Sequence, residues 1–162
     1  SILGAQGLTT IEAAANFIPQ TVAALLGTLG LGAIVDRIDP RWGVAASMLT
    51  MAGALGLLPF VGPGISGVIF GVLLGAAMGA LRGVEAAAFV RYYGRGHIGA
   101  IRGLATAIGL ASTALGPLYF ALGLTLTGSY AGPSLVAALF PLLVALSAIF
   151  IRPPAAPDTL QK

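Results

Sequence analysis

The chain has 162 residues, of which 57% are hydrophobic and 8% charged, and its formal net charge is +3. A soluble domain of this length needs about a quarter of its residues charged to cover its surface, so this composition excludes a fully solvated globular domain. The chain contains no cysteine, which excludes disulfides and thiolate metal sites within it. Its basic residues mostly flank apolar segments, which favours a membrane surface over nucleic acid as their partner.

Five apolar segments follow one another along the chain, each long enough for a helix to cross the hydrocarbon core, which takes about 20 residues. Turn residues and charges separate the segments. The predicted spans are 11–35, 43–61, 65–90, 98–126 and 132–151. In this all-α membrane fold we expect residues 1–10 to hold the end of a preceding helix and an outer loop, residues 11–152 the five-span bundle, and residues 153–162 a cytoplasmic tail.

The basic residues predict how the chain is oriented. Arg37 and Arg41 lie in the first connection between spans and four arginines surround the third, whereas the second and fourth connections hold no Lys or Arg. By the positive-inside rule the basic side is cytoplasmic, so we expect an inner-membrane protein that begins outside and ends inside. Most multi-span carriers have an even number of spans with both ends inside, and the first Met is Met48, so we also expect a truncated N-terminus.

Three spans carry a polar or small-residue face, whereas the second and fifth have few polar side chains and are expected to face lipid. At 100° per residue, Asn16 and Gln20 share one stripe of the first span, and Ser112 and Thr113 share one side of the fourth. For Asn16 and Gln20, beside Pro19, helix packing and cavity lining are equally favoured.

The third span has glycine at every fourth position: Gly67, Gly71, Gly75, Gly79 and Gly83. This spacing lets helix backbones approach closely in a bilayer, so we expect these glycines to serve helix packing.

Arg82 and Glu85 are charged residues within or at the end of the third span. That span ends between Leu81 and Val90, and a helix that runs to Val90 places Arg82 about 12 Å inside its cytoplasmic end. An arginine in a span costs at least about 3 kcal/mol, so it normally faces a cavity and is paired. Two interpretations stay equally open: a structural ion pair, or an Arg82 that binds an anionic substrate group and is neutralised by Glu85 when the site is empty.

Two stretches of the chain resemble the major facilitator superfamily. Residues 32–41 resemble its cytoplasmic loop signature, although Asp39 stands where Gly is usual and Pro40 where a basic residue is usual. The motif positions that match are Gly32, Asp36, Arg37 and Arg41. Residues 92–103, followed by Gly116-Pro117, are similar to the passage between the tenth and eleventh helices of bacterial members, above all of monocarboxylate and oxalate/formate-type carriers.

This resemblance implies that the chain is helices eight to twelve of a twelve-helix carrier, with helices eight, ten and eleven lining the cavity. Such a carrier moves a small solute, here an organic anion, by rocking two six-helix halves about a site near the midplane. The partners implied are the bilayer, the N-terminal half of the same transporter and the solute, with no cofactor. Asp36 would meet the positive N-terminal end of a neighbouring helix, and Gly116 and Pro117 would serve packing.

The residues also bear on two rival functions, an intramembrane enzyme and a small structural membrane protein or channel subunit. The sequence Gly64-Ile-Ser66-Gly67 resembles a rhomboid-protease motif, but Ser66 and His97 lie at opposite ends of the third span, more than about 30 Å apart, so we expect no enzyme. His97 has no partner at metal-ligand spacing, so we expect no metal site. A small five-span structural membrane protein or channel subunit stays open as the alternative to a carrier.

The orientation predicts a labelling pattern in the cysteine-free chain. Single cysteines that replace Gly64 and Ser129 are expected to react with a membrane-impermeant thiol reagent from outside, because both sites fall in connections without basic residues. Cysteines that replace Asp39 and Gly96 are expected to react only after permeabilisation. Labelling of the Asp39→Cys variant from outside would overturn the orientation and the alignment with the carrier family.

The expected truncation predicts that this chain alone transports nothing, because a carrier of two halves needs both to form its cavity. Liposomes that contain only residues 1–162 are expected to take up radiolabelled solutes no faster than empty liposomes. Substrate-specific uptake by these liposomes would contradict the expectation.

Overall fold

The computed structural model describes residues 10–15, 17–35, 37–62, 64–93 and 98–150. All regular structure in these segments is helical. The helices are α2 (Thr10–Ala15), α3 (Phe17–Ile34), α4 (Pro40–Leu57), the short 3-10 helix η1 (Leu58–Phe60), α5 (Ile65–Tyr93), α6 (Ile98–Thr127) and α7 (Ala131–Phe150). Five of them, α3 to α7, are long and apolar enough to cross a membrane. The prediction of an all-helical chain with five helices of membrane-crossing length is confirmed.

The helix ends differ from the predicted spans where local chemistry extends a helix. α4 begins at Pro40 and not at residue 43, because Asp39 caps it: the Asp39 carboxylate accepts the N–H of Arg41 at 3.3 Å, and Pro40 occupies the first turn. α5 continues to Tyr93, past the predicted end at residue 90, since residues 84–93 contain neither glycine nor proline. Arg82 and Glu85 therefore lie well inside a continuous helix.

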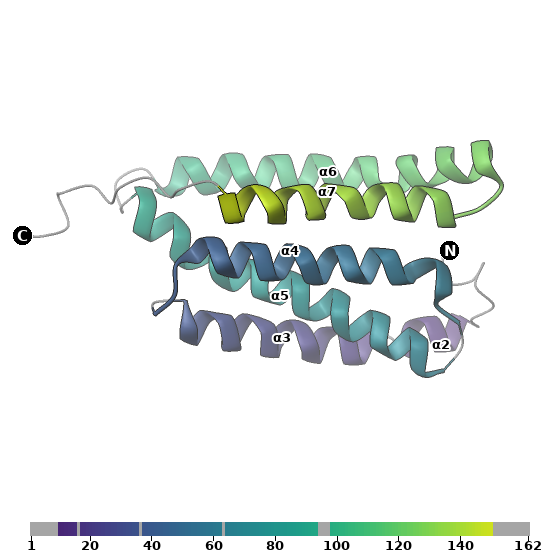
Figure 1. Cartoon of the computed structure of the whole chain (residues 1–162), viewed down its shortest axis with the longest axis horizontal. Helices are drawn as coiled ribbons and strands as arrows, with labels where there is room; N and C mark the ends of the chain where they lie inside the picture. Colours follow the sequence, from purple (N-terminus) through teal and green to yellow (C-terminus); the bar gives the residue numbers. More distant parts are fainter. Residues whose placement is uncertain (1–9, 16, 36, 63, 94–97, 151–162) are drawn as a thin grey trace, which may run out of the picture.

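The helices form an elongated bundle whose members run along its long axis (Figure 1). α4 lies centrally, packed on α5 and on α7, and α5 packs most extensively on α3. α6 contacts α7 and α5 only sparsely. The α3–α4 and α5–α6 connections lie at one end of the bundle and the α4–α5 and α6–α7 connections at the other (Figure 1). The two connections rich in arginine thus share one end, which is what the predicted orientation requires.

α3 and α5 touch backbone to backbone along a seam of α5 glycines. A Cβ at Gly75 would overlap the carbonyl oxygen of Gln20, and a Cβ at Gly79 would overlap that of Ala24. From the first contact to the second, the position on α5 advances from Gly75 to Gly79 and the position on α3 from Gln20 to Ala24. Both advances are four residues in the same direction, so the two helices run parallel and in register. Such close approach leaves the α5 Cα–H groups against α3 carbonyl oxygens, a contact that recurs between membrane helices.

Thr28 continues this seam by one further turn. Its hydroxyl donates to the carbonyl oxygen of Ala24 on its own helix at 2.9 Å and lies 3.0 Å from that of Gly79 on α5. A Cβ at Gly83 would stand 3.0 Å from the Thr28 carbonyl oxygen. On the α3 side, a Cβ at Gly27 would stand 2.8 Å from the Ala76 oxygen. The seam therefore leaves little or no room for a Cβ at Gly27 of α3 or at Gly75, Gly79 and Gly83 of α5, and the Thr28 side chain enters it as a hydrogen-bond donor.

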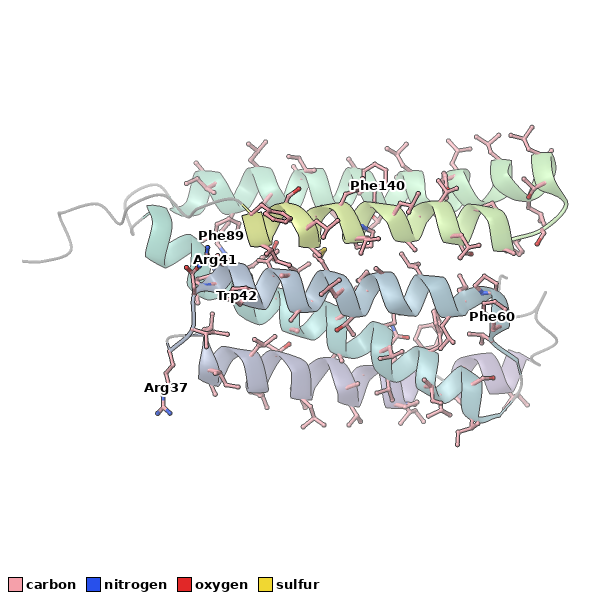
Figure 2. All side chains as sticks on the ribbon, viewed as in Figure 1. Arg37, Arg41, Trp42, Phe60, Phe89 and Phe140 are labelled. Atoms are coloured by element: carbon pink, nitrogen blue, oxygen red, sulfur yellow. The ribbon has the colours of Figure 1, made fainter. Side chains whose placement is uncertain are left out.

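Small side chains also build the rest of the interior, and large apolar ones point outward around the bundle (Figure 2). Val84 of α5 fits against Gly43 of α4, where an added Cβ would stand 2.5 Å from the Val84 Cγ2. The expectation that the second and fifth spans face lipid is wrong where α4 and α7 pack on each other and where α4 packs on α5, because small residues allow this contact. The buried small residues of α4 include Ala45, Ser47 and Ala54.

α6 and α7 are fastened to each other near their shared connection. The ring of Pro133 lies where a Cβ of Gly123 would stand, so α7 meets the α6 backbone there. The Tyr119 hydroxyl donates to the Pro133 carbonyl oxygen at 2.8 Å. These two contacts fix the hairpin at one end, although α6 otherwise touches its neighbours little.

The seam predicts different costs for two glycine substitutions. Gly79→Ala is expected to destabilise the protein by about 1–3 kcal/mol, because its new methyl group has no space beside the Ala24 carbonyl. The matched control is Gly53→Ala in α4, where nothing lies within 4 Å of the added Cβ and the change improves helix propensity. Thermal unfolding of both variants in detergent, followed by circular dichroism, checks this. Equal stability of the two variants would contradict the backbone contact.

Candidate functional site

One face of α5 is covered by neither α3 nor α4. The glycine seam lies against α3, and Val84 lies against α4. The third face presents Met78, Arg82 and Glu85, all three exposed. Because these residues are three and four positions apart, they form one stripe along the helix. This stripe carries the charges that the sequence places within the span.

A groove of about 420 Å³ runs between α3 and α5 beside this stripe. The α3 side contributes Gln20, Thr21 and Thr28, and the α5 side ends at Arg82. The remaining lining residues are Phe17, Ala24, Leu25, Gly75, Met78 and Gly79. Gln20, one of the cavity candidates from the sequence, therefore shares a hollow with the Arg82 side chain.

A second groove, of about 400 Å³, runs between α5 and α6. Its charged residues are Arg82, Glu85 and Arg102, and its hydroxyl-bearing residues are Thr106 and Thr113. The other lining residues are Phe89, Ala105, Gly109 and Leu110. The sparse contact between α5 and α6 leaves this space open.

Arg82 lines both grooves and joins them. It lies eleven residues before the end of α5, about 16 Å inside the helix at 1.5 Å per residue. The first groove extends from Arg82 back to Gly75 and the second forward to Phe89, so together they follow about 21 Å of α5. The two grooves together form a track along one side of the bundle, mostly apolar beside α3 and about half polar beside α6, with an arginine near its middle.

The charges in the track do not neutralise one another within the described residues. Arg82 and Glu85 share a face, yet they form no ion pair with each other, and the direct pair considered from the sequence is absent. The ion pair that the described residues do form joins Arg41 Nε and Asp39 Oδ2 at 3.3 Å, at the end of the bundle. Among the described residues, no carboxylate oxygen lies within 4 Å of the Arg82 guanidinium.

The other cavity candidates are placed unequally. Thr113 lines the α5–α6 groove, whereas Ser112 is exposed outside both grooves. Both hydroxyls donate to carbonyl oxygens of α6 itself, Ser112 to Ile108 at 2.9 Å and Thr113 to Leu110 at 2.7 Å. Asn16 lies outside the described residues.

The loop motif lies at the arginine-rich end of the bundle (Figure 2). Arg37 is exposed and points away from the helices, whereas Arg41 lies beside its neighbour Trp42, with its guanidinium carbon 5.4 Å from the ring centroid. Nothing lies within 4 Å of an added Cβ at Gly32. Asp36, the central residue of the motif, lies outside the described residues, so its contact with a helix end stays a prediction.

The predicted packing residues are also placed unequally. Gly67 and Gly71 are buried in α5, as are the three glycines of the α3 seam. In α6, nothing lies within 4 Å of an added Cβ at Gly116, and Pro117 is exposed. These two residues of α6 therefore face away from the helices that the structure describes.

Four polar residues of the track were not singled out as site residues from the sequence: Thr21, Thr28, Arg102 and Thr106. Arg102 was counted only among the arginines that orient the chain, and the three threonines were not considered. For Arg102 and Thr106 the available signal was the hairpin itself, because α5 and α6 are joined by residues 94–97 alone. Side chains equally far from that connection on the two helices lie at similar depth in the bundle.

The Ser66 hydroxyl is hydrogen-bonded to the backbone of Gly62, at the start of α5. This hydroxyl lies 3.0 Å from the N–H of Gly62, which donates to it, and 3.1 Å from the Gly62 carbonyl oxygen, which accepts from it. His97, the other residue of the rejected catalytic pair, lies outside the described residues. In the part of the chain that the structure describes, no three His, Cys, Asp or Glu side chains gather as a metal site would require.

Comparisons of the chain with models of protein families, with curated proteins and with solved structures found no match. Membership of the major facilitator superfamily therefore stays a prediction from the resemblance of residues 32–41 and 92–103. What stands independently of that resemblance is a bundle with five helices of membrane-crossing length and two grooves along α3, α5 and α6.

Proposed function

We propose that the chain is part of a secondary active transporter of the major facilitator type, which moves a small organic anion across the inner membrane by alternating access. The observation that carries the proposal is Arg82: an exposed guanidinium, about 10 Å inside the end of the apolar span 65–89, which lines two grooves at once. An arginine at such a depth is expensive and normally marks a substrate or ion pathway.

The chemistry of Arg82 favours an anionic solute. Its planar guanidinium presents paired donors that match a carboxylate, and the charge persists at any physiological pH. Gln20 and Thr28 supply uncharged polar groups in the groove on one side of Arg82, and Glu85 supplies a carboxylate on the other. In this proposal Glu85 is the internal counter-charge that a bound anion replaces.

The division of labour among the helices supports the carrier assignment. The three helices that line the grooves, α3, α5 and α6, are those that the resemblance equates with the cavity-lining helices eight, ten and eleven. α4 and α7 contribute no residue to either groove. Both grooves are open along one side, and there we propose that the N-terminal half of the carrier packs and completes the cavity.

Substitution of Arg82 in the full-length carrier tests the proposed role. Arg82→Lys is expected to raise the half-saturating substrate concentration about tenfold or more, because lysine keeps the charge but loses the paired donors. Arg82→Ala is expected to abolish uptake in proteoliposomes while leaving expression and detergent stability near normal. Thr125→Ala, which truncates an exposed polar side chain outside both grooves and outside the loop motif, is the control and is expected to transport normally.

Two outcomes would contradict this assignment in different ways. Normal uptake by the Arg82→Ala carrier would show that Arg82 does not bind the solute. Loss of folded protein on gel filtration, for Arg82→Ala but not for Thr125→Ala, would show that Arg82 acts in folding and not in binding of the solute.

A further inference from the structure

Arg102 of α6 lines the same groove as Arg82 and Glu85 of α5. Distances along the two helices give the order of these charges in depth. Arg102 lies four residues into α6, whereas Glu85 and Arg82 lie eight and eleven residues before the end of α5. At 1.5 Å per residue they stand about 6, 12 and 16 Å from the α5–α6 connection. One carboxylate therefore lies between two guanidiniums along a single groove.

All three residues lie within membrane-crossing segments, Glu85 and Arg82 in 65–89 and Arg102 in 99–127. Among the described residues none of the three forms an ion pair, and all three are exposed to the groove or to its open side. The groove carries two positive charges and one negative charge. Even when Glu85 neutralises one arginine, the second guanidinium has no counter-charge among the described residues that line the groove.

We propose that Arg102 is a second anion-binding residue, which holds the carboxylate of the solute near the α5–α6 connection before that carboxylate reaches Arg82. This inference rests on the proposed function and extends it, because it gives the groove two binding positions in series. Glu85 lies between them and competes with the solute for each guanidinium in turn. Thr106, one turn further into α6 than Arg102, lies beside the path between the two positions.

The cysteine-free chain permits a direct test of the electrostatic field in the groove. Thr106→Cys is the reporter, and Thr125→Cys, an exposed threonine of the same helix outside both grooves, is the matched control. In phosphatidylcholine nanodiscs the reaction rates with an anionic sulfonatoethyl and a cationic trimethylammonioethyl methanethiosulfonate reagent are compared. The anionic-to-cationic rate ratio is expected to be higher at Thr106→Cys, because two guanidiniums flank that site.

Substitutions in the Thr106→Cys background are expected to move this ratio with the sign of the charge removed. Arg102→Gln is expected to lower the ratio about fivefold, as is Arg82→Gln, and Glu85→Gln to raise it by a similar factor. Arg102→Lys retains the charge and is expected to preserve the ratio. Arg37→Gln, which removes a charge outside the grooves, is expected to leave it unchanged. Gel filtration of each variant, and an unaltered ratio in the Thr125→Cys background, show that folding is intact.

The outcomes separate this inference from the function on which it rests. If Arg82→Gln lowers the ratio and Arg102→Gln does not, Arg102 has no part in the site and only this inference is wrong. If neither lowers it, the groove attracts no anion, and the proposed function loses its support as well.

A competition experiment identifies the class of occupant. Sodium acetate is expected to slow the anionic reagent at Thr106→Cys, and to do so less in the Arg102→Gln variant. If acetate has no effect but phosphatidylglycerol in the nanodisc slows the reagent, the occupant is a lipid phosphate and the assignment to a solute carboxylate is overturned.

Discussion

The backbone contact between α3 and α5 is the constraint on which the rest of the bundle depends. Gly75 and Gly79 fix which face of α5 meets α3, because any side chain there would meet a carbonyl oxygen. At 100° per residue, Arg82 lies about 60° from the direction of Gly79 around the helix, just beside the seam. Its side chain therefore extends from α5 beside the contact with α3, and it lines both grooves. Rotation of α5 about its axis would remove Arg82 from this junction and force side chains into the seam.

The charged residues of the chain fall into two environments with different energetics. Asp39 and Arg41 pair at the end of the bundle, where about a third of the Arg41 side chain is exposed, and a pair of this kind contributes roughly 0–1 kcal/mol. Arg82, Glu85 and Arg102 lie in membrane-crossing helices without such pairing among the described residues. Arg82 and Glu85, the two deeper charges, cost insertion energy without an ion pair among the described residues, and this cost is the basis for proposing that they bind a solute.

The sequence predicted those parts of the structure that depend on periodicity within one helix. Apolar length located the five membrane-crossing helices, and the four-residue spacing on α5 indicated a surface for close helix approach. The identity of the partner was not predictable, because Gln20, Ala24 and Thr28 on α3 share no distinctive residue type. The sequence also did not predict that α4 lies at the centre of the bundle. The buried residues of α4 are small, and small residues occur in a helix whether its surface meets protein or lipid.

The charged residues of the site were predictable only where a charge is conspicuous within its own helix. Arg82 stood out because a charge in an apolar segment is costly wherever the helix packs. Arg102 did not stand out, because a charge close to a helix end matches an ordinary interfacial anchor when its helix is considered alone. Its role emerges only when α5 and α6 are folded back on each other and their depths are compared.

Thr28 bears on the order in which the bundle is assembled during synthesis. α3 enters the bilayer before α5 has been made, so any polar group of α3 that depended on α5 would wait in hydrocarbon without a partner. The Thr28 hydroxyl avoids this state, since it already bonds the Ala24 carbonyl on its own helix at 2.9 Å. The Gly79 carbonyl oxygen on α5, at 3.0 Å, can share the same hydroxyl proton as a second acceptor. The Thr28 hydroxyl can therefore enter the bilayer already bonded within α3, and the arrival of α5 gives it a second acceptor without leaving it unpaired at any stage.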